Sequence, residues 1–208
     1  MNTDYTALAL VIDRSGSMHS VAGDTVGSVQ NFISSQKKQD GKATLTMVQF
    51  DHEYEVLHRG DLQKADEHAF AEQYSPRGST ALLDAIGRTT IDLSAQIESM
   101  EEAERPARVV VAIITDGYEN ASTDFTATKI RELIKEKEAL GWDFIFMGAT
   151  MDTMTVAQDH GFSSAKSAYY EGKNVTEAFS NIDVQVTNAR QGQEIAISDA
   201  DRVILAGG

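Results

Sequence analysis

Three short polar segments carry the residues whose types and spacing could do chemistry. Two segments follow apolar runs, the third is a Gly-Ser-Thr segment, and the residues concerned are Asp13, Ser15, Ser17, Thr80 and Asp116. Carboxylate and hydroxyl oxygens are hard ligands, which suit Mg²⁺, Mn²⁺ or Ca²⁺ better than copper or zinc. Buried carboxylates beside a metal are also chemically sensible, because an unpaired buried carboxylate is costly. The segments therefore predict a divalent-metal site if the fold brings them together.

Each segment alone has a simpler explanation, because aspartates commonly cap helices and serines commonly close turns. The surrounding elements decide between the two explanations. Apolar and β-branched runs alternate with segments of helical periodicity, which is typical of an α/β fold. Strands are predicted at residues 5–12, 43–50, 53–57, 109–114 and 142–147, and helices at about 26–38, 81–102, 126–140, 152–160 and 179–189.

Strands separated by helices imply right-handed crossovers and a mostly parallel sheet. We therefore predict a doubly wound, Rossmann-like α/β fold, in which helices flank a central sheet and residues 53–57 form one short antiparallel edge strand. Ligand sites in such sheets lie beyond the carboxyl ends of the strands. Asp13 and Asp116 both follow predicted strands, and Thr80 precedes the longest predicted helix. The three segments should thus meet at one edge of the sheet.

The length of 208 residues indicates one domain. We assign residues 1–191 to it and treat 192–208 as a C-terminal tail or arm, in which 194–197 and 203–205 have strand-like character. Two interpretations of this stretch stay open. It packs back on its own domain, or it adds a strand to a neighbouring subunit or partner.

Composition excludes several classes of function. The sequence has no cysteine, which rules out disulfides and thiolate metal sites and suits a reducing compartment. The net charge of −14 disfavours nucleic acid as a partner. The first residues resemble no secretion signal, and the longest apolar run, 109–114, has six residues. We therefore expect a cytoplasmic protein that does not enter a membrane, with a phage particle as the other possible location.

The five polar residues resemble those of a known family. Asp13-x-Ser15-x-Ser17, Thr80 in its Gly-Ser-Thr loop and Asp116 in a Thr-Asp-Gly turn look like the complete metal-ion-dependent adhesion site of von Willebrand factor A domains. The resemblance covers about residues 5 to 190, and the Asp-x-Ser-Gly-Ser-Met form is more similar to intracellular bacterial and phage-type members. It implies that Ser15, Ser17 and Thr80 touch the cation, while Asp13 and Asp116 hold it through water.

The resemblance implies a protein-interaction module, acting as an adaptor or assembly component and not as an enzyme. Its cofactor would be Mg²⁺ or Mn²⁺, with Ca²⁺ as a further option, and its partner would supply an Asp or Glu carboxylate. The oligomeric state is open. Residues that would contact the partner around the cation are Met18, His19, Arg77, Ser79, Gly117 and Tyr118.

Two alternatives belong to other classes of protein. One is a structural component, such as part of a phage particle, that assembles through its C-terminal arm. The other is a metal-dependent hydrolase or phosphotransfer enzyme that uses Asp13 and Asp116. The sequence places no obvious general base beside these aspartates, and it lacks phosphate-binding and dinucleotide-binding glycine motifs. The enzyme is therefore the less favoured alternative.

Overall fold

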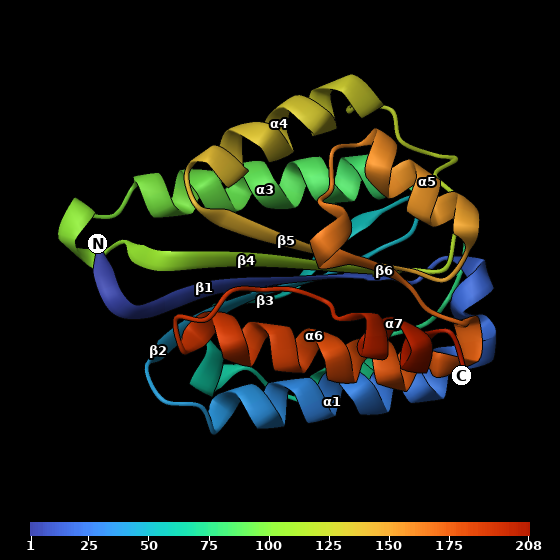
Figure 1. Cartoon of the computed structure of the whole chain (residues 1–208), viewed down its shortest axis with the longest axis horizontal. Helices are drawn as coiled ribbons and strands as arrows, with labels where there is room; N and C mark the ends of the chain where they lie inside the picture. Colours follow the sequence, from blue (N-terminus) through green and yellow to red (C-terminus); the bar gives the residue numbers. More distant parts are fainter.

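One six-stranded sheet forms the middle of the molecule, and helices cover both of its faces (Figure 1). This computed structural model describes the backbone of residues 1–208 and every side chain except those of Met151, Asp152 and Val156. The strand order is β3-β2-β1-β4-β5-β6. The strands are β1 (Asn2–Asp13), β2 (Lys42–Phe50), β3 (Tyr54–Asp61), β4 (Pro106–Thr115), β5 (Trp142–Gly148) and β6 (Ser167–Tyr169). All neighbours pair in parallel except β2 and β3, which confirms the predicted fold class.

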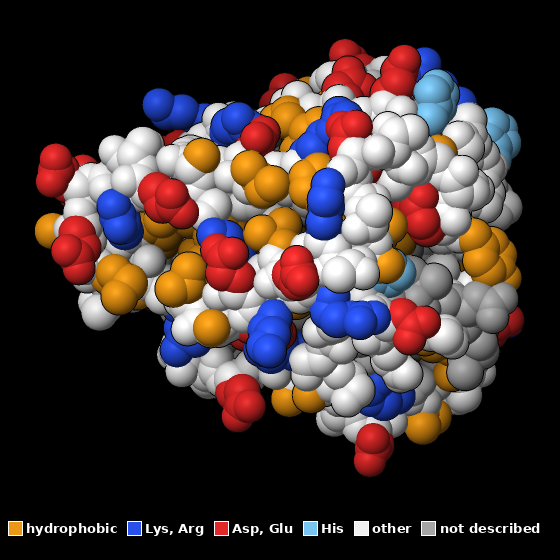
Figure 2. Space-filling view, turned by 90° about the horizontal axis from the view of Figure 1, so that it is seen from above, with side chains coloured by type: hydrophobic (Ala, Val, Ile, Leu, Met, Phe, Trp, Pro, Cys, Tyr) orange, Lys and Arg blue, Asp and Glu red, His pale blue; other side chains and the backbone are white. Residues whose placement is uncertain are grey.

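Two groups of helices pack on the two faces of the sheet. One face carries α3 (Leu82–Glu98), α4 (Ala127–Ala139) and α5 (Met151–Asp159), and the other carries α1 (Ala22–Lys37), α2 (Ala69–Gln73), α6 (Val175–Arg190) and α7 (Asp199–Leu205). Five short 3₁₀ turns complete the described backbone: η1 (Gly16–Val21), η2 (Leu62–Lys64), η3 (Glu102–Glu104), η4 (Ser164–Lys166) and η5 (Gly172–Asn174). Seen from the α4 side, acidic and basic side chains are mixed over the surface (Figure 2).

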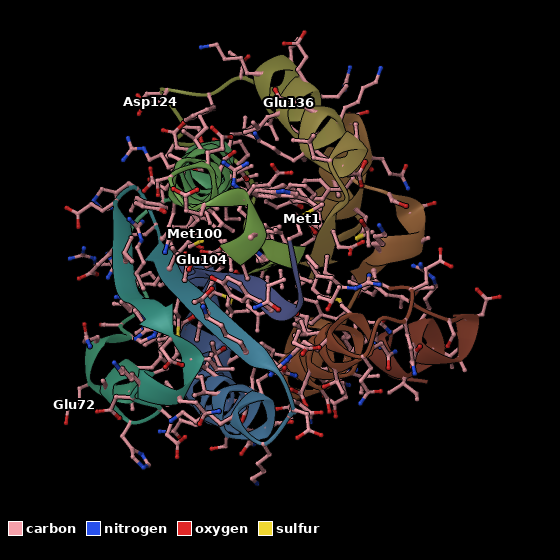
Figure 3. All side chains as sticks on the ribbon, turned by 90° about the vertical axis from the view of Figure 1, so that its left-hand side faces the viewer. Met1, Glu72, Met100, Glu104, Asp124 and Glu136 are labelled. Carbon is pink, nitrogen blue, oxygen red and sulfur yellow. The ribbon has the colours of Figure 1, made fainter. Side chains whose placement is uncertain are left out.

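The central strand β1 is apolar without a break over residues 7–12, because this part of the strand is buried on both faces. Its alternate side chains enter two hydrophobic clusters, so Leu10 and Ile12 pack towards α1 and α6, whereas Ala9 and Val11 pack towards α3 and α4. A parallel strand buried on both faces needs apolar residues at every position. The amino ends of β1 and β4 lie together at the end of the molecule shown in Figure 3, near Met1, Met100 and Glu104. The residues of the predicted metal site lie at the opposite, carboxyl ends.

Some predicted boundaries are wrong for identifiable reasons. The helix predicted to reach residue 102 ends at Glu98, because the Arg105 guanidinium donates to the carbonyl oxygens of Glu98 (2.8 Å) and Met100 (3.1 Å). The strand-like character of 203–205 is also wrong, since these residues lie in α7. Ser198 and Asp201 form a capping box that starts this helix. The structure adds β6 and α2, which the sequence pattern did not predict.

The C-terminal residues 192–208 pack on the same body as the rest of the chain. Ile195, Ile197 and Leu205 are buried in the hydrophobic cluster that contains α1 and α6. Arg202 donates to the carbonyl oxygens of Ser167 (2.7 Å) and Ser164. These contacts are those of a tail folded back on its own domain. Within the described part of the chain, none of the helices combines the length and the apolar character that a bilayer crossing requires.

Candidate metal centre

The carboxyl ends of β1 and β4 bring two of the polar segments into contact. The two strands run in parallel, with Ile12 opposite Ile114. Thr115, the last residue of β4, donates its hydroxyl hydrogen to Asp13 Oδ2 over 2.5 Å. The Ser17 hydroxyl donates to Asp116 Oδ1, also over 2.5 Å. Residues that lie about a hundred positions apart in sequence therefore share one hydrogen-bonded cluster.

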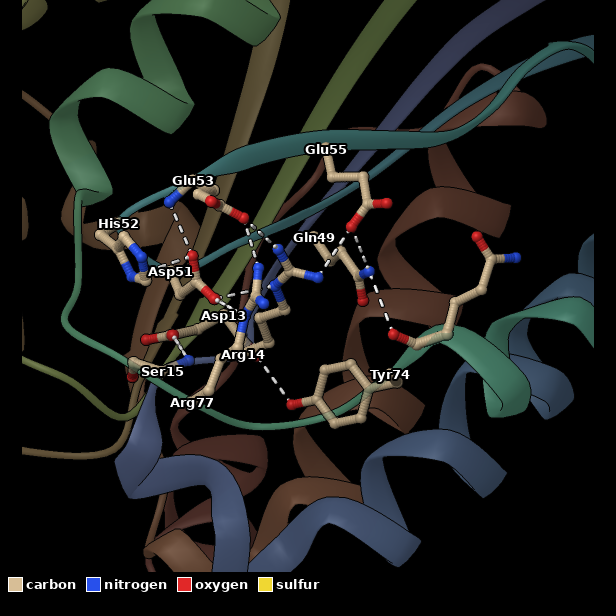
Figure 4. Close-up of polar contacts among 11 residues, drawn as sticks. Asp13, Arg14, Ser15, Gln49, Asp51, His52, Glu53, Glu55, Tyr74 and Arg77 are labelled. Atoms are coloured by element: carbon tan, nitrogen blue, oxygen red, sulfur yellow. Dashed lines mark hydrogen bonds and ion pairs between the residues drawn. The ribbon is translucent and has the colours of Figure 1, made fainter.

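Asp13 is the most deeply placed residue of this cluster. Its side chain is fully buried, its Oδ1 accepts the Ser15 amide over 2.6 Å, and its backbone carbonyl accepts the Tyr74 hydroxyl over 2.7 Å (Figure 4). Burial raises the pKa of Asp13 to about 6, although hydrogen bonds from Thr115 and Ser15 act in the opposite direction. A buried ionised carboxylate is unfavourable without a counter-charge. The position of Asp13 therefore favours a cation beside it.

Gly117, in the third segment, marks the point on which oxygens from the other two segments converge. A methyl carbon built on its Cα would lie 2.5 Å from Thr80 Oγ1, 3.0 Å from Ser15 Oγ and 3.2 Å from Asp13 Oδ2. The Ser15 and Ser17 hydroxyls are 3.0 Å apart, which extends the cluster to Asp116. A glycine is required here, because any side chain would occupy the space between these oxygens.

Thr80 is fixed by the segment that follows Asp116. The Asn120 carboxamide accepts the Thr80 amide over 2.9 Å, and the Thr80 carbonyl accepts the amides of Asn120 (3.0 Å) and Ala121 (3.2 Å). The first turn of α3 is held by the same segment, since Glu119 accepts the Leu83 amide over 2.9 Å. Free amides at a helix start need such acceptors. The Thr80 hydroxyl is therefore held in place relative to Gly117.

The chemistry of the donor set fits a hard divalent cation. It combines the two carboxylates of Asp13 and Asp116 with the hydroxyls of Ser15, Ser17 and Thr80. Burial raises the pKa of Asp116 as well, against the hydrogen bond from Ser17. The described side chains contain no group of three or more His, Asp or Glu residues placed to hold a metal, which is the arrangement that zinc usually uses. Oxygen donors of this kind suit Mg²⁺, Mn²⁺ or Ca²⁺.

The residues expected to contact a partner differ in exposure. His19 and Ser79 are exposed, Tyr118 is half exposed, and Arg77 is half exposed but bonded to Asp51 and Glu53. The expectation that Met18 contacts a partner is wrong, because the short helix η1 turns its side chain fully into the core.

Gly117 is likewise buried, enclosed by the oxygens that surround it. It therefore shapes the site from within and presents no exposed surface.

Sequence reasoning missed Asp51 and Asn120. Asp51 directly follows β2, so the rule that drew attention to Asp13 and Asp116 also applied to it. The sequence gives no such indication for Asn120, because its hydrogen bond with Thr80 depends on the path of the loop after β4. The side chain of Tyr74 also reaches the site, from the residue after α2, which the sequence pattern did not predict.

Comparisons with solved structures identify the fold of this protein. No family model and no curated protein matches the sequence. Among solved structures, the vWF domain of the type V pili tip protein Mfa5 from Porphyromonas gingivalis matches with a TM-score of 0.62 and 12% identity, covering 92% of this chain and 98% of that one. Manganese-loaded TRAP protein from Plasmodium vivax matches with a TM-score of 0.59 and 15% identity, covering 88% of this chain and 75% of that one.

Other matches come from longer chains. A von Willebrand factor type A structure from Catenulispora acidiphila has a TM-score of 0.61 and 13% identity, and it covers 88% of this chain. This chain spans 43% of that protein, 45% of a thread matrix protein from the mussel byssus and 30% of the pilus adhesin SpaC from Lactobacillus rhamnosus. Identities this low establish the fold alone. The protein therefore has the fold of a von Willebrand factor A domain.

Proposed function

We propose that this protein is a divalent-metal-dependent protein-interaction module. The observation that carries the proposal is the convergence of Thr80 Oγ1, Ser15 Oγ and Asp13 Oδ2 on the space beside Gly117. Similar folds occur in a pilus adhesin, a pili tip protein and manganese-loaded TRAP protein, which supports an interaction role and a divalent ion. We further propose a cytoplasmic location, which the absence of cysteine from the sequence favours.

The residues divide into two roles. The hydroxyls of Ser15, Ser17 and Thr80 would hold Mg²⁺ or Mn²⁺ directly, and the carboxylates of Asp13 and Asp116 would hold it through water and orient those hydroxyls. Neutral ligands leave most of the charge of the ion uncompensated. When bound, the ion supplies a Lewis-acidic position that a carboxylate of a partner protein can occupy. Asp13 and Asp116 accept hydrogen bonds from hydroxyl and amide groups, which suits a role in positioning those groups.

Metal binding is tested by titrating chelator-treated protein with Mn²⁺ and Mg²⁺ in a calorimeter. We expect saturable binding at one site. Loss of an outer contact at a metal site costs about 10- to 100-fold in affinity. Ser15→Ala and Asp116→Ala should weaken binding by at least that factor. Ser20→Ala removes an exposed hydroxyl of the same short helix, η1, and should bind as the unaltered protein does. Equal affinity in all variants, or no saturable binding, would contradict the proposal.

Salt dependence tests how the partner binds. The net charge of −14 repels an acidic partner. Charges are screened beyond ~8 Å at physiological ionic strength but only beyond ~30 Å at about 0.01 M salt. A tetra-aspartate peptide should therefore bind the Mn²⁺-loaded protein more weakly at low salt. Water-proton relaxation measures this binding, because a carboxylate on Mn²⁺ displaces a bound water. Tighter binding at low salt would contradict a contact made through the ion against an acidic surface.

A further inference from the structure

Asp51 connects two of the segments that form the candidate metal site (Figure 4). It directly follows β2, and its side chain is fully buried. Its Oδ2 accepts the Nε hydrogens of Arg14 (3.1 Å) and Arg77 (2.9 Å), and its Oδ1 accepts the Glu53 amide over 2.6 Å. Arg14 lies between Asp13 and Ser15, and Arg77 lies three residues before Thr80. One carboxylate thus holds an arginine from each segment.

Backbone hydrogen bonds reinforce the same connection. The Arg77 amide donates to the Arg14 carbonyl over 2.8 Å, and the Gly16 amide donates to the Gly78 carbonyl over 3.3 Å. The Ala81 amide, next to Thr80, donates to the Asp51 carbonyl over 2.8 Å. Gly78 has a φ of +66°, a conformation that favours glycine. The 77–81 segment is therefore held between the 13–17 segment and Asp51.

The charges in this network are unequally buried. Burial alone would raise the pKa of Asp51, but the Glu53 amide and the guanidinium groups of Arg77 and Arg14 hold it below its usual value. Arg14 is 5% exposed and also pairs with Glu55 over 2.7 Å, whereas Glu53 is 60% exposed. Breaking a buried ion pair is far more costly than breaking an exposed one. Asp51, and not Glu53, should therefore determine where the arginines lie.

We propose that Asp51 is a positioning residue that holds the Thr80 hydroxyl against Ser15 through Arg14 and Arg77. The effect on metal binding rests on the proposed function, but the positioning itself does not. Without the carboxylate, Arg77 loses its buried anchor, and only backbone hydrogen bonds still tie the 77–81 segment to Arg14 and Gly16. Thr80 is then held by Asn120 on one side alone, so that Thr80 Oγ1 moves from the space beside Gly117 that it shares with Ser15 Oγ. The site loses one of its three hydroxyls.

A double-mutant cycle tests this proposal on Mn²⁺ affinity. We expect Asp51→Asn to weaken binding by about 10- to 100-fold, the usual cost of losing an outer contact. In the Thr80→Ala background, the same change should cost less than about threefold, because it acts through Thr80. The matched control is Glu53→Gln, which removes an exposed carboxylate from the same Arg77 and should change the affinity less than about threefold. Equal losses in both backgrounds would overturn the proposal, since general loosening of the fold predicts them.

Hydrogen exchange in the chelator-treated protein separates this proposal from the proposed function. We expect Asp51→Asn to speed exchange of the Arg77 and Ala81 amides, whereas Glu53→Gln leaves both unchanged. Should Asp51→Asn fail to fold, Arg77→Gln cuts the same link at a half-exposed side chain and should speed exchange of the Ala81 amide. Unaltered exchange in the Asp51 and Arg77 variants would overturn the positioning role. If the unaltered protein binds no Mn²⁺, the proposed function fails and the exchange result still decides the role of Asp51.

Discussion

We expect the Gly117→Ala variant to remain folded but to lose saturable Mn²⁺ binding. The added methyl carbon would lie 2.5 Å from Thr80 Oγ1, 3.0 Å from Ser15 Oγ and 3.2 Å from Asp13 Oδ2. In this variant Thr80 cannot easily move away, because Asn120 holds its amide and its carbonyl group and Asp51 holds the neighbouring Arg77. The methyl group therefore takes the space on which the oxygens converge. Overpacking of this kind costs about 1–3 kcal/mol of stability, which a denaturation curve will show beside the calorimetric titration.

Gly27→Ala is the matched control for this substitution. Gly27 lies within α1, and a methyl carbon built there meets no described atom within 4 Å beyond its chain neighbours and the backbone of its own helix. Alanine is favoured over glycine inside a helix by about 1 kcal/mol, so this variant should be more stable than the unaltered protein and bind Mn²⁺ equally well. If Gly117→Ala binds Mn²⁺ as tightly as Gly27→Ala does, the cation does not occupy the space that the three oxygens share.

The strand pattern predicted most of the fold because burial on both faces leaves a simple sequence signal. β1 and β4 contain unbroken apolar runs at 7–12 and 109–114, so the carboxyl ends of these strands, and with them Asp13 and Asp116, could be located without a structure. β6 has three residues, too few to show any period. The tail shows how a local signal is overlooked. Ser198 and Asp201 have the spacing of a capping box, yet the apolar residues after them suggested a strand.

The sequence could not predict in which direction the side chains around the site point. Met18 follows Ser17 and looks equally placed for a partner, but η1 turns it into the core. The contacts of Asp51 join positions 37 and 26 residues away along the chain, to Arg14 and Arg77. Such pairs depend on how three loops approach one another. A pattern within one segment carries no information on that approach.

The second large predicted effect is that of replacing Asp13, which should weaken metal binding but raise the stability of the metal-free protein. We expect Asp13→Asn to abolish Mn²⁺ binding and to stabilise the metal-free protein at neutral pH. The buried carboxyl group has a pKa of about 6, against 3.8 for the ordinary value. The folded state binds this proton more tightly than the unfolded state does. The stability that the protonated Asp13 contributes is therefore fully present below pH ~4, and it is lost as the pH rises through ~6. Asparagine has no proton to lose in this range, so the Asp13→Asn variant keeps its stability as the pH rises.

The hydrogen bonds around Asp13 can also be made by the carboxamide group of asparagine. The amide oxygen can still accept from Ser15, and the Thr115 hydroxyl, which lies 3.4 Å from the Gly117 carbonyl, can turn its hydrogen there and accept from the new amide. We expect a gain of about 1–3 kcal/mol at pH ~8 that shrinks towards pH ~4, measured by urea unfolding in the presence of a chelator. A constant difference across this range would show that burial of the charge is not what makes Asp13 costly. A pH-dependent gain in stability together with loss of Mn²⁺ binding would mean that the ionised Asp13 carboxylate destabilises the metal-free fold and is needed to bind the cation.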